Sequence, residues 1–206
     1  MVITYPVGSG LYVNLTNRCP CACECCLRKS GPGVNGKDSL WLTREPTVAE
    51  VIADLEARDL SVYKEVVFCG YGEPTERLAD LLEVARHLRQ KAPEMPIRIN
   101  TNGLADLIHG RDTAGDLKGL VDVVSISLNT PDPDEYFRVC HPKFGPQSYA
   151  AMLKYARDCV AVVPKVVMTV VDEPVTSLAN QEKCRQIAAS AGAVLRVRPF
   201  VGEREK

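Results

Sequence analysis

Short β-branched runs alternate along the chain with apolar stripes at helical spacing, and this alternation restricts the possible folds most strongly. Most of the runs are continuously apolar, which is typical of strands covered on both faces. Strands that alternate with helices form α/β domains around a parallel sheet. We therefore predict an α/β fold with six strands, at residues 11–15, 65–69, 97–101, 121–128, 165–171 and 194–199.

Four amphipathic stripes between these runs predict helices, because their apolar residues lie on one helical face. Thr47 and Glu50 have the spacing of a capping box before the first stripe, and Gly192 suits a left-handed helix end after the last. The stripes are Val48, Val51, Ile52 and Leu55; Leu78, Leu81, Leu82 and Ala85; Tyr149, Met152, Leu153 and Ala156; and Cys184, Ile187, Ala188 and Ala191.

The chain length favours a single domain over residues 1–206, because 206 residues are enough for one core and few for two. Residues 28–45 contain glycines and a proline without clear periodicity and predict a long loop. Long loops in compact domains are usually functional. We therefore expect that residues 28–45 form a lid.

The charge balance gives no sign of a nucleic-acid partner, since 25 Lys and Arg residues face 26 Asp and Glu residues. The first ten residues lack a basic and apolar signal segment, and the longest apolar stretch, 160–171, contains Pro164 and Lys165. We expect a cytoplasmic protein without a membrane association. Nine cysteines, five of them between Cys19 and Cys26, favour metal binding over disulfides.

Only Cys19, Cys23 and Cys26 in this group have the spacing C-x3-C-x2-C. Three thiolates on one short loop can hold three irons of a cubane 4Fe–4S cluster and leave the fourth iron open for reaction. The alternative is a structural zinc site, which takes four Cys or His ligands. No second cysteine pair with suitable spacing follows, and the histidines are scattered along the sequence. The roles of Cys21 and Cys25 stay open.

Further motifs follow the next three predicted strands. They read Cys69-Gly70-Tyr71-Gly72-Glu73-Pro74-Thr75, Asn100-Thr101-Asn102-Gly103 and Ser125-Ile126-Ser127-Leu128-Asn129. With the cysteine spacing, they resemble the radical S-adenosylmethionine (radical SAM) superfamily. The resemblance implies a partial (βα)6 barrel, also called a partial TIM barrel, with a 4Fe–4S cluster and SAM as cofactors. It also implies that SAM is contacted by Gly72, Glu73, Asn102, Ser127 and Asn129.

The same resemblance implies an enzyme that reductively cleaves SAM to a 5′-deoxyadenosyl radical and abstracts hydrogen from a substrate. The electron donor would be a flavodoxin or a ferredoxin. Segments 40–47, 118–122 and 196–198 look most like the small TatD nuclease-associated radical SAM proteins. The substrate, a small molecule or a protein, is not indicated, because the residues expected in the lower barrel are ordinary apolar types.

Three alternatives stay open at this point. Within the enzymes, a glycyl-radical activase shares the cysteine spacing, and a 7-carboxy-7-deazaguanine synthase-like enzyme shares the small partial barrel. The third alternative is a zinc-bound or degenerate scaffold that binds a partner. One departure from the superfamily is Cys25, which stands where members usually carry an aromatic residue near the adenine. Small apolar packing is the expected role of Cys69, Cys140, Cys159 and Cys184.

Overall fold

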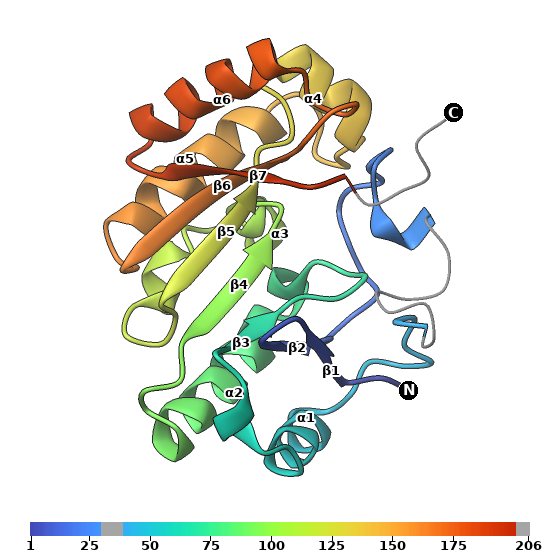
Figure 1. The fold of residues 1–206 in the computed structure, drawn as a ribbon, viewed down its shortest axis with the longest axis vertical. Coiled ribbons are helices and arrows are strands. Elements are labelled where there is room, and N and C mark those ends of the chain that lie inside the picture. The colour runs from blue at the N-terminus through green and yellow to red at the C-terminus, as the bar shows by residue number, and fades with distance from the viewer. Residues whose placement is uncertain (30–38, 201–206) are drawn as a thin grey trace.

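The computed structural model describes residues 1–29 and 39–200, which form a seven-stranded sheet in the order β1-β2-β3-β4-β5-β6-β7 (Figure 1). Strands β2 to β7 are parallel, and β1 joins β2 antiparallel. The sheet is open, because β1 and β7 are its two edges. The strands are Thr4–Val7, Gly10–Val13, Glu65–Phe68, Ile97–Thr101, Val123–Ser127, Lys165–Val171 and Val194–Arg198.

Six α-helices follow the strands and cover one side of the sheet (Figure 1). The α-helices, α1 to α6, are Val48–Glu56, Leu78–Lys91, Ala105–His109, Pro133–Cys140, Ser148–Val160 and Leu178–Ser190. The 3-10 helices, η1 to η4, are Leu27–Lys29, Leu60–Val62, Pro74–Arg77 and Ala114–Leu117. In the described part of the chain, no helix combines the length and the apolar character needed to cross a bilayer.

The predicted α/β fold is confirmed, and the sheet contains one strand more than predicted. The additional strand, β1, is short and contains Pro6, which weakens a strand pattern but is tolerated at a sheet edge. Helices α3 and α4 were also not predicted, and α3, with five residues, is too short for a clear apolar stripe. The capping box of Thr47 and Glu50 and the left-handed conformation of Gly192 are both present.

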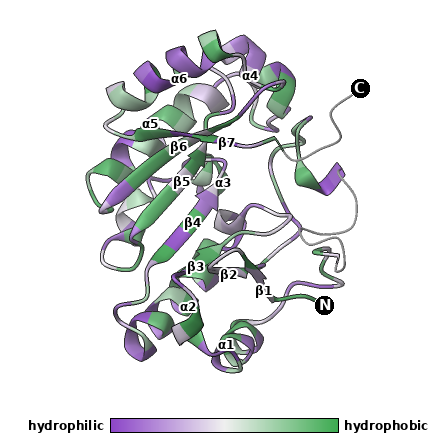
Figure 2. Cartoon of the chain, in the orientation of Figure 1, coloured by the Kyte–Doolittle hydropathy of each residue, from purple (hydrophilic) through white to green (hydrophobic). Residues whose placement is uncertain are grey.

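The two faces of the sheet differ in chemistry, which corrects the expectation of strands with apolar residues on both faces. Val66, Phe68, Ile99 and Ile126 are fully buried in the core between the strands and the helices. The alternate positions of β4 carry Arg98 and Asn100 instead, and Figure 2 shows hydrophilic colour within this strand. The opposite face of the sheet is therefore mixed, with Val67 and Val123 beside Arg98 and with Val167 beside Ser125, so the expectation of ordinary apolar residues in the lower barrel holds only in part.

The described part of the predicted lid is firmly attached to the loop after β2. The Asn14 side chain donates to the Leu40 carbonyl at 2.7 Å, and Asn17 both donates to and accepts from the Leu42 backbone. Leu40 and Leu42 are also buried. Residues 30–38 of the predicted lid lie outside the described residues.

Candidate functional site

The loop that carries the five clustered cysteines leaves β2 and returns along the carboxyl ends of the strands (Figure 1). Cys21 is 5% exposed, Cys19, Cys23 and Cys26 are half-buried, and Cys25 is exposed. Hydrogen bonds from Cys21 lower the pKa of Cys19, and hydrogen bonds from Cys140 and Cys21 lower the pKa of Cys23. The same contacts raise the pKa of Cys21. Cys19 and Cys23 therefore favour the thiolate form, which binds metals, whereas Cys21 favours the thiol.

The cysteine loop lies against the C-terminus of α4, where helical carbonyl groups lack partners within the helix. The Ala22 amide donates to the Cys140 carbonyl at 3.0 Å, and the Glu24 amide donates to the Val139 carbonyl at 2.9 Å. Beyond the helix, the Lys143 amide donates to the Pro20 carbonyl at 2.8 Å. Helix α4 therefore holds the position of the cysteine loop.

Arg28 is the charged residue in closest contact with the cysteine loop. Its Nε lies 3.4 Å from the Cys26 sulfur, and its Nη2 donates to the Cys21 carbonyl at 3.0 Å. The guanidinium also lies over the Trp41 ring, 5.9 Å from the ring centre. Sequence reasoning did not identify Arg28, although its position two residues after the last ligand candidate was visible.

Gly72, after β3, permits a close approach between this strand end and the cysteine loop. A Cβ atom at Gly72 would lie 2.2 Å from the Thr16 carbonyl oxygen and 2.7 Å from that of Arg18. The next amide, of Glu73, donates to the Arg18 carbonyl at 2.8 Å. Only glycine fits here without a backbone shift.

The Glu73 carboxylate is 4% exposed and accepts four hydrogen bonds. One oxygen accepts from the Thr75 amide and hydroxyl and from the Thr101 hydroxyl, at 2.7 to 3.1 Å, and the other accepts from the Asn102 amide at 2.7 Å. Burial raises the pKa of Glu73. Within the described residues, no cationic side chain pairs with it. The site thus offers a buried acceptor without a counter-charge, which suits an ammonium group.

The remaining predicted SAM contacts follow β4 and β5. The Asn102 side chain lies 3.9 Å from the sulfurs of Cys19 and Cys21, so it reaches the cysteine loop. Ser127 is the last residue of β5. Asn129 has a left-handed backbone, with a φ of 65°, and its amide group donates to the Cys140 sulfur at 3.2 Å.

All eight predicted site residues line one cleft of about 210 Å³ at the carboxyl ends of the strands. They come from the cysteine loop and from the ends of β3, β4 and β5, which are far apart in the sequence. Residues that sequence reasoning did not assign also line it, and they include Arg28, Cys69, Tyr136, Cys140, Arg196 and Arg198. Cys69 and Cys140 are therefore not merely packing residues, because their side chains border the site.

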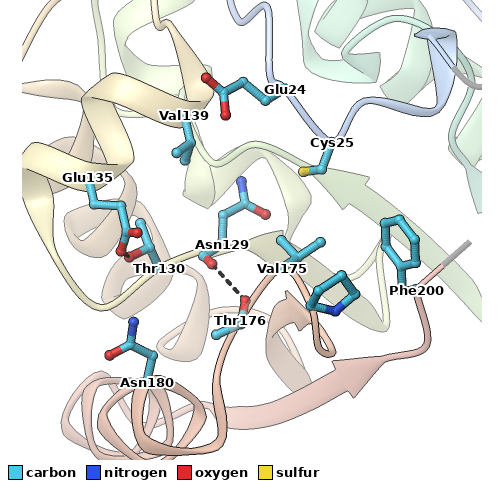
Figure 3. Close-up of a pocket in the computed structure, with 11 residues that line it drawn as sticks. Glu24, Cys25, Asn129, Thr130, Glu135, Val139, Val175, Thr176, Asn180 and Phe200 are labelled. Atoms are coloured by element: carbon cyan, nitrogen blue, oxygen red, sulfur yellow. Dashed lines mark hydrogen bonds between the residues drawn. The ribbon is translucent and has the colours of Figure 1, made fainter. Parts of the chain in front are cut away.

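A second pocket, of about 360 Å³, adjoins the cleft and shares Cys25 and Asn129 with it (Figure 3). Val175 and Phe200 form an apolar side of this pocket, and Phe200 lies on the same side as Cys25 in the close-up. The Thr176 hydroxyl donates to the Asn129 carbonyl at 3.3 Å. This pocket extends the cleft toward an aromatic ring.

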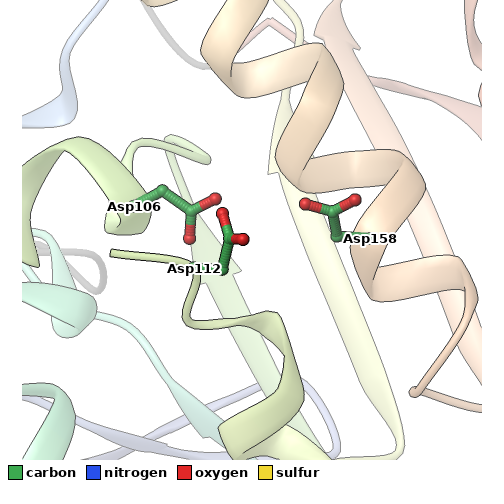
Figure 4. A group of neighbouring side chains, drawn as sticks. All are labelled: Asp106, Asp112 and Asp158. Atoms are coloured by element: carbon green, nitrogen blue, oxygen red, sulfur yellow. The ribbon is translucent and has the colours of Figure 1, made fainter. Parts of the chain in front are cut away.

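A cluster of carboxylates lies away from the cleft, where Asp106 and Asp112 approach Asp158 of α5 (Figure 4). Lys154 contacts all three, at 2.6 Å from Asp112 and Asp158 and 3.3 Å from Asp106. Its ammonium group supplies the positive charge that such a cluster needs. We interpret the cluster as an ion-pair network between α3 and α5.

The sulfur positions distinguish between a zinc ion and a larger metal cluster. A tetrahedral zinc site, with Zn–S distances of about 2.3 Å, brings its sulfurs within about 4 Å of one another. Among residues 1–29 and 39–200, no three cysteine sulfurs lie within 4.8 Å of one another. Cys19, Cys23 and Cys26 all line the open cleft, where three thiolates could hold a multi-iron cluster.

Comparison with solved structures identifies similar folds. SuiB from Streptococcus suis, bound to the precursor peptide SuiA, has a TM-score of 0.66 and 14% identity over 94% of this chain and 39% of SuiB. A radical SAM methyltransferase from Sphaerobacter thermophilus has a TM-score of 0.63 and 19% identity over 95% of this chain and 57% of its own. The [FeFe]-hydrogenase maturase HydG from Carboxydothermus hydrogenoformans has a TM-score of 0.64 and 16% identity over 93% and 44%.

The chain therefore spans between 39% and 57% of the length of these three structures. No curated protein matches the chain. The family model of the radical SAM superfamily matches residues 13–176, which include the cysteine loop and the ends of β2 to β6. The match covers most of the chain, and the chain belongs to the radical SAM superfamily.

Proposed function

We propose that this chain is a radical SAM enzyme in which Cys19, Cys23 and Cys26 hold a 4Fe–4S cluster and the same cleft binds SAM. Members of the superfamily use these two cofactors. The observation that carries the proposal is the convergence of eight residues from separate segments on one cleft. Such convergence at the carboxyl ends of parallel strands is typical of ligand sites in α/β folds.

The chain's own residues orient and neutralise the bound groups. Arg28 contacts Cys26 and offsets the negative charge of the thiolates. Asn102 reaches toward Cys19. The buried Glu73 would receive the ammonium group of SAM, and Ser127 and Asn129, which line the same cleft, would contact its remaining polar groups. When bound, the cluster and SAM supply a one-electron cleavage that yields a 5′-deoxyadenosyl radical for hydrogen abstraction from the substrate.

Phe200 supplies the aromatic surface that the sequence lacks at position 25. It lines the pocket that adjoins the cleft, and this pocket also contains Cys25 (Figure 3). An aromatic ring at this position can stack on an adenine base. Phe200 would therefore hold the adenine of SAM on the side of the cleft that carries Cys25.

The domain and partner assignments follow from the same proposal. Residues 1–206 act as one radical SAM domain, and a flavodoxin or ferredoxin supplies the electron. Segments 40–47, 118–122 and 196–198 support membership of the TatD nuclease-associated group. In the structure, the first of these segments is attached to the loop after β2 and the last lines the cleft.

The proposed activity is tested by SAM cleavage. The protein is reconstituted with iron and sulfide under anaerobic conditions, reduced with dithionite and incubated with SAM. We expect 5′-deoxyadenosine to form, measured by chromatography, and to require both the reductant and the cluster. A reconstituted and reduced protein that leaves SAM intact would contradict the proposal.

Replacing Glu73 with glutamine is expected to weaken SAM binding while the iron content stays unchanged. An amide keeps the size of the side chain but removes the negative charge that faces the ammonium group. We expect the dissociation constant of SAM, measured by calorimetry, to rise about tenfold. Glu83→Gln is the matched control, because Glu83 is an exposed acid of α2 that does not line the cleft. Equal SAM affinity in the Glu73→Gln variant would refute this role.

A further inference from the structure

The polar face of the sheet carries more positive charge than its acidic groups can offset. Arg98, Arg196 and Arg198 come from β4 and β7. Arg98 pairs with Glu65, with a contact of 2.8 Å, and its Nη2 lies 3.1 Å from the Tyr12 hydroxyl. Within the described residues, no carboxylate pairs with Arg196 or Arg198. Two guanidinium charges therefore face the cleft with no carboxylate partner among residues 1–29 and 39–200.

Arg196 reaches a deeper level of the cleft than the proposed SAM contacts. In the sheet register, Ser127 pairs with Thr169 and Thr169 with Arg196, so these residues form one row. The Arg196 guanidinium crosses toward β5 and lies 3.5 Å from the Ser125 hydroxyl, one row below Ser127. Asn100 pairs with Ser125 in that lower row. Arg196 thus meets polar groups on the floor of the cleft.

Several polar atoms around this floor are buried without a partner. The Nε atoms of Arg98 and Arg198 and the Oδ1 atom of Asn100 have no hydrogen-bond partner in the described part of the chain. Arg98 is also 7% exposed, so water cannot easily satisfy it. A buried donor without an acceptor is costly, and proteins keep such donors mainly where a ligand supplies the acceptor. The unpaired guanidinium donors call for an oxyanion.

Repulsion among the neighbouring arginines also favours a bound anion. Burial, followed by the neighbouring positive charges of Arg98 and Arg198, lowers the pKa of Arg196. An arginine stays protonated in spite of such a shift. A bound anion would relieve the repulsion among these cations, and two guanidinium groups are well suited to a carboxylate or a phosphate.

We propose that Arg196 and Arg198, which line the cleft from β7, bind an anionic group of the substrate, a carboxylate or a phosphate. The assignment to a substrate rests on the proposed function, whereas the anion site itself does not. It gives the substrate class as a small anionic molecule and places its charged end beside Arg196 and the Ser125 hydroxyl.

The test measures anion binding to the cluster-loaded protein at saturating SAM and constant ionic strength. Inorganic phosphate and malonate serve as probes, and the rise in thermal unfolding temperature gives each dissociation constant. We expect Arg196→Met and Arg198→Met to raise the constant for the better probe about tenfold or more. Arg196→Lys keeps the positive charge but loses the bidentate geometry of the guanidinium group. Its dissociation constant for the probe should therefore lie between those of the methionine variants and that of the wild type. The better probe identifies the substrate's charged group as a phosphate or a carboxylate.

Arg185→Met is the matched control, because it removes one positive charge from the exposed face of α6. Its anion binding should equal that of the wild type. Unchanged anion binding in both cleft variants would overturn the proposal. The proposal would also be overturned if the probe competed with SAM and Arg196→Met lost SAM affinity to the same extent. That result would assign the arginines to the SAM carboxylate. Arginine-dependent anion binding without SAM cleavage would leave the anion site standing while the proposed function fails.

Discussion

Replacing Cys19, Cys23 or Cys26 with alanine will abolish cluster assembly, whereas Cys21→Ala and Cys25→Ala will retain it. Each of the first three removes a thiolate that holds one iron, and two remaining thiolates are too few to keep a cubane in place. Cys21 is the most buried cysteine of the loop and lies close to Cys19 and Cys23, whose pKa it lowers. Cys25 is exposed.

The measurement is the iron and sulfide content of each variant after anaerobic reconstitution, with the visible spectrum as a second readout. The two retained variants are the matched controls, since they remove the same side chain from the same loop. Cys21→Ala should also lower the yield of the cluster slightly, because its contacts to both neighbours are lost. Equal iron loss in all five variants would contradict the assignment of the three ligands.

Gly72→Ala should lower the free energy of unfolding by about 2 to 3 kcal/mol and impair cluster assembly. The added Cβ would lie 2.2 Å from the Thr16 carbonyl oxygen, and a backbone atom cannot turn aside as a side chain does. The segment that leads into Cys19 must therefore shift. The close approach at Gly72 joins the end of β3 to the cysteine loop. The free energy of unfolding and the iron content should therefore fall together.

Gly115→Ala is the control for this prediction, because a Cβ atom there would meet nothing within 4 Å. Its free energy of unfolding should stay within about 0.5 kcal/mol of the wild type. Urea titrations of both variants give the comparison, and iron content is measured on the same preparations. A Gly72→Ala variant with wild-type stability and iron content would show that the close approach does not matter.

The strand pattern of the sequence predicted six of the seven strands in the described sheet. Residues 97–101 and 165–171 were predicted with the bounds that β4 and β6 have, because these runs are long and rich in β-branched residues. Strand β1 was missed because it is short and contains a proline. Helix α4 was missed in spite of a visible signal, since Asp132 and Pro133 form a helix start.

The candidate site could be predicted only in the parts that follow strands. The resemblance to the radical SAM superfamily indicated Glu73, Asn102 and Asn129, and the structure brings them to one cleft because the carboxyl ends of parallel strands lie at the same edge of the sheet. Cys140 and Phe200 were not, because they reach the site through tertiary packing that local patterns do not encode. The polar residues on the cleft side of β4 had a signal that was overlooked: this strand alternates apolar residues with Arg98 and Asn100, as a strand with one polar face does.

An open iron position in the cluster is the centre of this account, and electron paramagnetic resonance of the reduced protein tests it directly. The anaerobically reconstituted wild type should contain about four iron and four sulfide ions per chain and give a cubane signal. Addition of SAM should change that signal, because SAM reaches an iron without a protein ligand. A cubane signal that is identical with and without saturating SAM, or a protein that assembles no cubane, would contradict the account.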